Sequence, residues 1–208
     1  SAEYLRPNLF TNTPDILPFF LQHGGRPAFM IRAVLAATLS PVYGIYSGFE
    51  LCENAALPGR EEYIDSEKYQ FKQRDWDAPG NIKALLTGLN RIRNENRALQ
   101  ELANLQFLRA ENDQILFYAK ATAALDNILL IAVNLDPWNA QSAWVEVPVE
   151  SFGLSPDATY QVHDLLTGER FLWHGRRNYI ALDPRARPAH VFRLRRRVAS
   201  ERDFDRYE

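Results

Sequence analysis

The chain has 208 residues, of which 24 are basic and 26 acidic, so its net charge of −2 excludes a surface dominated by positive charge and argues against a nucleic-acid partner. Its composition, with 46% hydrophobic residues, is typical of a globular protein, and no apolar run approaches the roughly 20 residues needed to span a membrane. The single cysteine, Cys52, excludes an intrachain disulfide and indicates a reducing, cytoplasmic location, and the first residues do not have the pattern of a signal peptide.

The first hundred residues alternate short apolar runs with helical periodicity. Residues 8–11 and 42–46 are predicted strands, and residues 27–39 and 81–96 are predicted helices, with a long polar loop over residues 47–79. The order strand–helix–strand–helix is typical of a parallel α/β architecture. Because parallel sheets are buried on both faces, two strands alone are too few. This stretch is therefore expected to be the end of a larger α/β domain.

From residue 106 onward, short β-rich runs follow one another with turn residues between them. This spacing predicts an antiparallel β-sandwich followed by a charged tail. The eight predicted strands are residues 107–109, 114–121, 127–134, 143–148, 160–164, 170–173, 178–182 and 189–194.

The first candidate functional residues follow the first predicted strand. Asp15 comes directly after this strand, in the segment that begins at Asn12. Ligands of α/β proteins bind at the carboxyl ends of strands, and a carboxylate there can accept hydrogen bonds from sugar hydroxyls or stabilise developing positive charge. The alternative is structural: Asp15 as the N-cap of a helix that opens at Ile16.

Two further groups of residues follow the second predicted strand. Gly48 allows a sharp turn, and Glu50 is either catalytic or a buried side chain that ties the loop. Residues 63–69 and 74–77 interleave aromatic and charged side chains, which suits either a carbohydrate ligand or a salt-bridged loop. The adjacent Glu61 and Glu62 would point apart and are a poor acid/base pair.

The remaining polar residues do not form a recognisable motif. There is no Gly-rich phosphate loop, no nucleophile elbow and no zinc motif, so neither a cofactor nor a metal ion is expected. Cys52 is predicted to be a small buried side chain. The basic run 193–197 is interpreted as a last strand and a solvated tail. The scattered histidines, predicted to be surface or hydrogen-bonded residues, are His23, His163, His174 and His190.

A series of short sequence motifs, in a fixed order along the chain, resembles a known family. They are NTPDIL (12–17), GGRPAF (24–29), YSGFELCE (46–53), PGREEY (58–63), DSEKY (65–69), RDWDAPGNI (74–82) and LNRIR (89–93). Together they resemble the α-1,4-glucan:maltose-1-phosphate maltosyltransferase branch of the α-amylase superfamily, glycoside hydrolase family 13. The resemblance is strong over residues 4–99 and weaker over the β-rich half.

The resemblance implies a division of the chain and a set of site residues. Residues 1–100 would form the seventh and eighth units of a (β/α)₈ TIM barrel, residues 101–197 an antiparallel β-sandwich C-terminal domain, and residues 198–208 a tail. Asp15 matches the transition-state stabiliser, which binds the 2- and 3-hydroxyls of the transferred sugar. Most members of the superfamily have His before this aspartate, whereas Pro14 agrees with the maltosyltransferases. Asn12 is assigned to substrate binding, and Lys68 and Tyr69 match residues that line the maltosyl donor pocket.

The function implied is a retaining transfer of maltosyl units from maltose 1-phosphate to the non-reducing end of α-1,4-glucans in bacterial glycogen-like synthesis. The nucleophile and the general acid/base would follow earlier strands, upstream of Ser1. Because retaining chemistry needs two carboxyls about 5 Å apart, the chain alone is expected to be inactive.

Two alternatives and an oligomeric state accompany this hypothesis. The alternatives are a carbohydrate-binding or scaffolding β-sandwich module, and a fragment of another family member such as a trehalose synthase or an amylase. The parent is expected to be a homodimer. The isolated chain is expected either to self-associate through apolar faces of the helix at residues 27–39 and of both strands in the first half, or to be partly disordered over residues 1–100.

Overall fold

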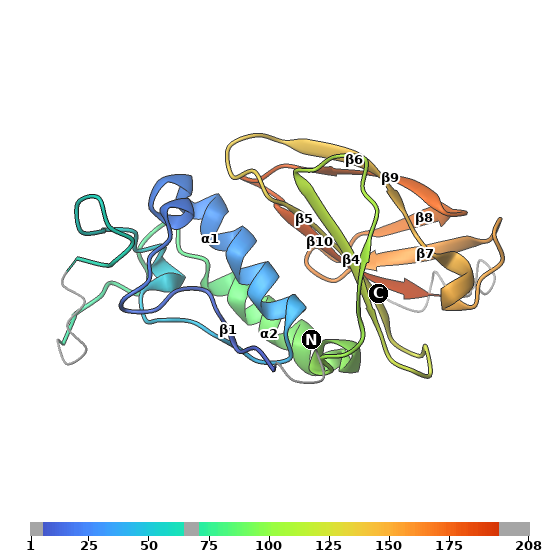
Figure 1. Cartoon of the computed structure of the whole chain (residues 1–208), viewed down its shortest axis with the longest axis horizontal. Coiled ribbons are helices and arrows are strands. Elements are labelled where there is room, and N and C mark those ends of the chain that lie inside the picture. The colour runs from blue at the N-terminus through green and yellow to red at the C-terminus, as the bar shows by residue number, and fades with distance from the viewer. Residues whose placement is uncertain (1–5, 65–70, 196–208) are drawn as a thin grey trace.

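The computed structural model describes residues 6–64 and 71–195, which form a layer of two helices beside a β-sandwich (Figure 1). The chain begins with β1 (Leu9–Phe10), α1 (Phe19–Leu39), β2 (Tyr43–Gly44) and the 3-10 turn η1 (Phe49–Leu51), followed by α2 (Lys83–Glu95) and η2 (Arg97–Gln100). β1 and β2 pair in parallel, with Leu9 opposite Tyr43, as the strand–helix–strand–helix order predicts. No helix in the described part is long and apolar enough to cross a membrane.

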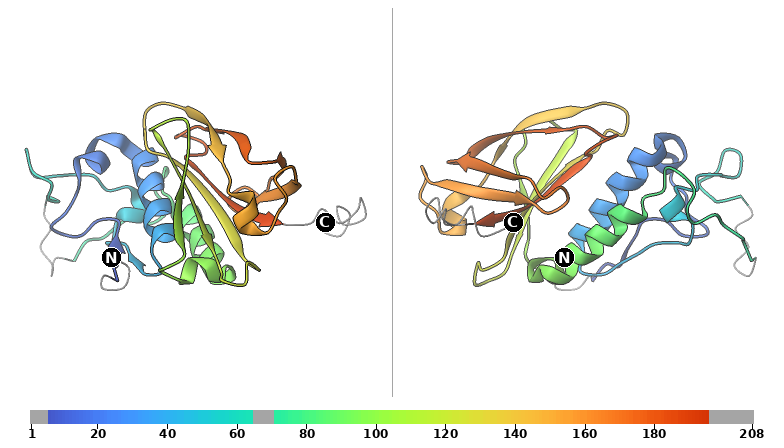
Figure 2. Two further views of the ribbon diagram at one scale, coloured as in Figure 1. Left: turned by 45° about the vertical axis from the view of Figure 1, so that its right-hand side comes forward. Right: turned by 180° about the vertical axis from the view of Figure 1, so that it is seen from behind.

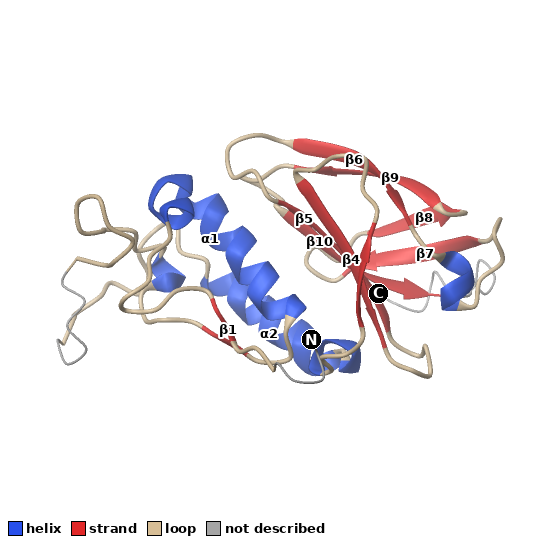
Figure 3. Ribbon diagram, in the orientation of Figure 1, coloured by secondary structure: helices blue, strands red, loops and turns tan. Residues whose placement is uncertain are grey.

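All eight strands predicted in the second half are present, and they pair antiparallel. A six-stranded sheet has the order β3-β4-β5-β10-β7-β8, and β6 pairs with β9 in a separate two-stranded sheet. Figure 3 shows these two sheets facing each other. The strand bounds are β3 (Leu105–Leu108), β4 (Ile115–Ala121), β5 (Ile128–Asn134), β6 (Gln141–Glu146), β7 (Thr159–Asp164), β8 (Arg170–His174), β9 (Arg177–Leu182) and β10 (Ala189–Arg195), with a 3-10 turn η3 (Val149–Phe152) after β6.

The centre of the six-stranded sheet is buried on both faces. Strand β5 is buried at all seven positions, which its continuous apolar run explains. One face contributes Leu129 and Ile131 to a core shared with α1 and α2, and the other contributes Leu130 and Ala132 to a core shared with β6 and β9. The helix layer and the two sheets therefore form three successive layers, as the views in Figure 2 show.

The packing of α1 corrects one expectation about exposed apolar surface. Over residues 27–39 its apolar side chains are buried or half-buried, in a core shared with α2 and β5, so this part of the helix does not present an apolar face to solvent. Exposed apolar side chains do lie at the two strands: Phe10 of β1 is 49% exposed, and Val42, directly before β2, is 53% exposed. The helix also begins earlier than predicted, at Phe19. It is kinked at Gly25, which has a φ of 58° and lies two residues before Pro27.

Arg93 of α2 forms hydrogen bonds with the C-terminal end of α1 and the residues that follow it. Its guanidinium donates to the carbonyl oxygens of Ala37, Ser40 (3.0 Å) and Pro41 (2.6 Å), and lies 4.8 Å from the centre of the Tyr43 ring. The last carbonyls of a helix have no partner within the helix. Burial lowers the pKa of Arg93, against the opposing effect of Tyr43. Arg93 thus joins α1, β2 and α2.

We expect Arg93→Met to lower the free energy of unfolding by about 2–3 kcal/mol, because the apolar stem remains while charged hydrogen bonds to buried carbonyls are lost. Urea denaturation followed by circular dichroism measures this. Arg91→Met is the matched control on the exposed face of the same helix and should change stability by less than about 0.5 kcal/mol. Equal effects of the two substitutions would show that the hydrogen bonds of Arg93 to the end of α1 do not stabilise the fold.

Candidate active site

The carboxyl ends of β1 and β2 lie side by side and carry the predicted polar clusters. The parallel register places Phe10 opposite Gly44, so the segments that begin at Thr11 and Ile45 leave the two strands at the same edge. Arg32 of α1 donates from Nε to the carbonyl oxygen of Thr11, which holds the end of β1 against the helix. This edge is where ligands of α/β proteins bind.

Asn12 is the buried hub of this edge. Its side chain is 1% exposed, and its Oδ1 accepts hydrogen bonds from Thr11 Oγ1 (3.0 Å) and from the Tyr46 amide (3.1 Å). Its Nδ2 donates to the Tyr63 hydroxyl at 2.6 Å. Asn12 therefore ties β1 to the segment after β2 and to the long loop. These contacts favour a positioning role, and its assignment to substrate binding stays a prediction.

Asp15 is exposed at the tip of a tight turn. The backbone groups of Thr13 and Ile16 exchange hydrogen bonds of 3.1 and 3.2 Å, and Pro14 and Asp15 form the tip between them. Helix α1 begins only at Phe19, so Asp15 is not the N-cap of a helix opening at Ile16. The Phe19 amide instead donates to Glu61 Oε1 at 2.7 Å. The structural alternative for Asp15 is thus not observed.

The loop after β2 is held by Glu53 and Arg74, two residues whose pairing the sequence did not reveal. Arg74 donates from Nε to Glu53 Oε1 at 2.7 Å and from a second nitrogen to Oε2 at 3.2 Å. The hydrogen bond to Glu53 raises the pKa of Arg74, against the effect of burial. The Glu53 carboxylate lies against Gly48, where an added Cβ would come within 2.2 Å of it and where φ is 99°. Glu50 accepts a hydrogen bond from the Gly48 amide at 3.0 Å, which is the predicted loop-tying role.

Tyr63 closes the back of the site. Its hydroxyl accepts from Asn12 and donates to the Glu53 carbonyl at 3.2 Å, and its ring centre lies 5.6 Å from that of Tyr46. Burial raises the pKa of Tyr63 to about 12, against the opposing effect of the Asn12 hydrogen bond, so the phenol stays protonated. The chain of contacts from Asn12 through Tyr63 to Glu53 makes this end of the strands a preorganised frame, and Asp15 follows Asn12 by three residues.

The remaining residues that the sequence singled out form contacts other than those with Asn12 and Tyr63, or lie outside the described part of the chain. Lys68 and Tyr69 lie outside the described residues. His190 is buried and bonded to Asp164, and burial raises the pKa of the Cys52 thiol to about 11. Asp77 forms an ion pair of 2.9 Å with Lys83, so part of the 74–77 segment is a salt-bridged loop. Within residues 6–64 and 71–195, no three His, Cys, Asp or Glu side chains gather as a metal site would require.

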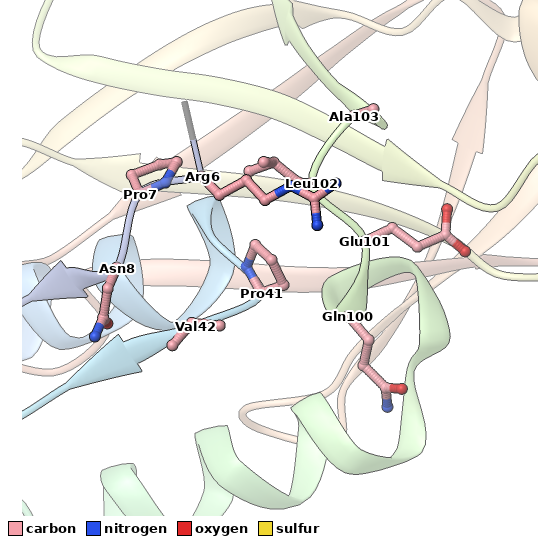
Figure 4. A pocket seen from close by; sticks show the side chains of 9 residues that line it. All are labelled: Arg6, Pro7, Asn8, Pro41, Val42, Gln100, Glu101, Leu102 and Ala103. Atoms are coloured by element: carbon pink, nitrogen blue, oxygen red, sulfur yellow. The ribbon is translucent and has the colours of Figure 1, made fainter. Parts of the chain in front are cut away.

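A cleft of about 820 Å³ lies at the opposite ends of β1 and β2. Figure 4 shows that its lining side chains come from the segments that precede the two strands and from the segment between η2 and β3. Arg6 and Glu101 are its charged residues, and most of the lining is apolar. Among its lining residues Glu101 is the single carboxylate, and the cleft lies at the end of the strands opposite to Asp15.

The fold is that of part of an α-amylase. An Anoxybacillus α-amylase superposes with a TM-score of 0.66 at 17% identity, over 95% of this chain and 40% of the amylase. The Geobacillus thermoleovorans α-amylase complexed with acarbose gives a TM-score of 0.63 at 17% identity, over 89% of this chain and 38% of that one.

Sequence comparison narrows this class. Residues 107–194 match the family model described as GLGE, C-terminal. The α-1,4-glucan:maltose-1-phosphate maltosyltransferase of Rhodospirillum rubrum is 58% identical over 93% of this chain, and that of Pseudomonas aeruginosa is 54% identical over 92%. The chain spans 28% and 29% of the lengths of these two relatives. It is a homologue of the C-terminal part of these bacterial maltosyltransferases, as the resemblance predicted.

Proposed function

We propose that this chain forms part of an enzyme that transfers maltosyl units from maltose 1-phosphate to the non-reducing end of α-1,4-glucans with retention of configuration. The observation that carries the proposal is the 58% identity to a maltosyltransferase over 193 residues. The exposed carboxylate of Asp15 at the carboxyl end of β1 supports it. The proposal includes a cytoplasmic location, which suits a protein with a single free cysteine.

The proposed architecture places β1, α1, β2 and α2 as the last two units of a (β/α)₈ barrel. The parallel pairing of β1 with β2 and the exposed Phe10 and Val42 support it, because barrel strands have neighbours on both sides. We place the barrel part at residues 1–100, the sandwich at 101–197 and the tail at 198–208. The core that α1 and α2 share with β5 would then be an interface between two domains.

In this proposal Asp15 is the transition-state stabiliser. Glycosyl transfer passes through an oxocarbenium-like state in which hydrogen bonds to the sugar 2-hydroxyl strengthen. Asn12 and Tyr63 hold the strand end that carries Asp15, and Lys68 and Tyr69 contribute to the donor pocket. The nucleophile and the general acid/base belong to another part of the longer protein, which is proposed to be a homodimer.

We expect the purified 208-residue chain to release no phosphate from maltose 1-phosphate in the presence of glycogen. Grafting it in place of the matching 28% of the Rhodospirillum rubrum enzyme should give a chimera that releases phosphate and lengthens the glucan. Activity of the chain alone would contradict its catalytic incompleteness. A folded chimera without activity would contradict the proposed function.

A further inference from the structure

The two-stranded sheet β6–β9 presents an outer face that the core does not use. Its inner side chains, such as Val145 and Ile180, are buried in the core of the sandwich. Side chains alternate along a strand, so the intervening residues point outward, and Trp144 and Tyr179 are 41% and 54% exposed there. This sheet lies on the side of the sandwich away from α1 and α2 (Figure 1).

The two aromatic side chains are held in a fixed arrangement. Trp144 and Tyr179 are direct cross-strand partners, with ring centres 5.4 Å apart and ring planes at 64°. The Arg177 guanidinium lies 4.4 Å from the centre of the Trp144 ring and pairs with Glu111 at 2.9 Å. Edge-to-face packing and the stacked arginine orient both rings before any ligand arrives.

A groove of about 470 Å³ runs beside Tyr179 on this same face. The next cross-strand pair on this outer face is Ser142 and Ala181, whose small side chains line the groove next to Tyr179. Gln141, Asp183 and Arg187 add polar groups to its lining. A volume of this size is within the range of small-ligand sites, and an aromatic wall with a few polar groups is their usual composition.

Two arginines of this face are already paired. Arg187 forms an ion pair of 2.7 Å with Glu169, as Arg177 does with Glu111. A face with neutralised arginines and the Asp183 carboxylate, which can accept hydrogen bonds from hydroxyls, gives no attraction to a strongly anionic partner. It suits an uncharged ligand with apolar ring faces and many hydroxyls, which is the chemistry of a glucan chain.

We propose that the groove beside Tyr179 on β6–β9 is a second glucan-binding site, in which a sugar ring stacks on Tyr179 and hydroxyls bond to the polar lining. The choice of an α-1,4-glucan as the occupant rests on the proposed function. The site belongs to the sandwich and uses none of the residues around Asp15. Its role is to hold the polymer on the enzyme, which raises the effective concentration of acceptor ends.

The test is native gel electrophoresis of the 208-residue chain in gels with and without glycogen, together with titration of maltoheptaose by tyrosine and tryptophan fluorescence. Tyr179→Ala should weaken binding about tenfold, whereas Tyr179→Phe should retain it, because the ring is the contact. Ala181→Arg should also abolish retardation by filling the groove while both aromatics remain. Phe107→Ala removes an aromatic that is 62% exposed on β3, away from this sheet, and is the matched control.

Retardation by glycogen that is lost in Tyr179→Ala and Ala181→Arg and kept in Phe107→Ala supports the site. No retardation of the parent chain, or retardation equal in all variants, overturns it. Maltose 1-phosphate should not displace the glucan from the chain, because the donor is expected at the Asp15 end. The gels contain no maltose 1-phosphate and measure only glucan binding, so they test the groove beside Tyr179. Failure of the chimera to release phosphate would count against the proposed function and not against this site.

Discussion

Asp164→Ala should lower the free energy of unfolding by about 3–5 kcal/mol, because it leaves buried partners of a carboxylate without their acceptor. Asp164 is 0% exposed at the end of β7. Its Oδ2 accepts from Thr167 Oγ1 at 3.0 Å and pairs with His190 Nδ1 at 2.9 Å, while its Oδ1 accepts from the amides of Leu166 and Val191. This one side chain joins the β7–β8 turn to β10.

The same carboxylate gives the stability a pH dependence with a definite sign. Burial opposes ionisation of Asp164, but the hydrogen bonds from His190, Leu166 and Thr167 outweigh it and hold the pKa below its ordinary value. A group whose pKa is lowered by folding stabilises the protein above its unfolded pKa of about 3.9 and loses this contribution as the pH falls through the folded value. The contribution of Asp164 should therefore be constant from neutral pH to about pH 5 and decrease below about pH 4.

Urea denaturation of the parent and of Asp164→Ala, repeated between neutral pH and pH 3, measures both effects. Asp183→Ala is the matched control, because the Asp183 carboxylate also accepts a backbone hydrogen bond, from Arg185 at 2.9 Å, but is exposed. Its cost should stay below about 1 kcal/mol. An Asp164 variant as stable as the control would show that the buried pair contributes little.

The sequence predicts the second half of the fold well because its signals are local. Strand β5 is apolar at nearly every position and β9 alternates, so both are recognisable from single runs. The pairing of β10 between β5 and β7 is not local, and nothing in the turn residues specifies it. The start of α1 was missed for the same reason: the Phe19 amide is satisfied by Glu61, which lies 42 residues away.

The residues of the candidate site also fall into two groups, those with a local sequence signal and those that only long-range contacts bring together. The position of Asp15 after a strand is a local signal, and the family motifs strengthened it. The frame behind it consists of Asn12 with Tyr63 and Glu53 with Arg74, whose members are 51 and 21 residues apart. Their side chains have ordinary roles in isolation, and the fold alone brings them together. Gly48, which lies against Glu53, does have a local signal: a glycine soon after a predicted strand indicates a sharp turn, and its φ is indeed positive.

The largest effect on activity is expected from Asp15→Asn in the chimera with the longer maltosyltransferase. The amide keeps the size and one acceptor of the side chain but removes the negative charge that, in the proposed role of Asp15, would face the oxocarbenium-like state. Removing one such electrostatic contact lowers kcat by roughly 10²–10³-fold in other enzymes, and we expect about 10³-fold here because a full charge is lost. Phosphate release from maltose 1-phosphate in the presence of glycogen measures this rate.

Stability separates this catalytic effect from a structural one. Asp15 is exposed at the tip of its turn, and the turn is closed by the backbone of Thr13 and Ile16, so Asp15→Asn should leave the urea midpoint unchanged. Asn12→Ala should behave in the opposite way, with reduced stability from the loss of three hydrogen bonds at a buried side chain. Asp157→Asn, an exposed aspartate of the sandwich, should change neither quantity. Loss of phosphate release at an unchanged urea midpoint would support the catalytic role, whereas an Asp15→Asn chimera with near-parental phosphate release would remove Asp15 from the catalytic groups.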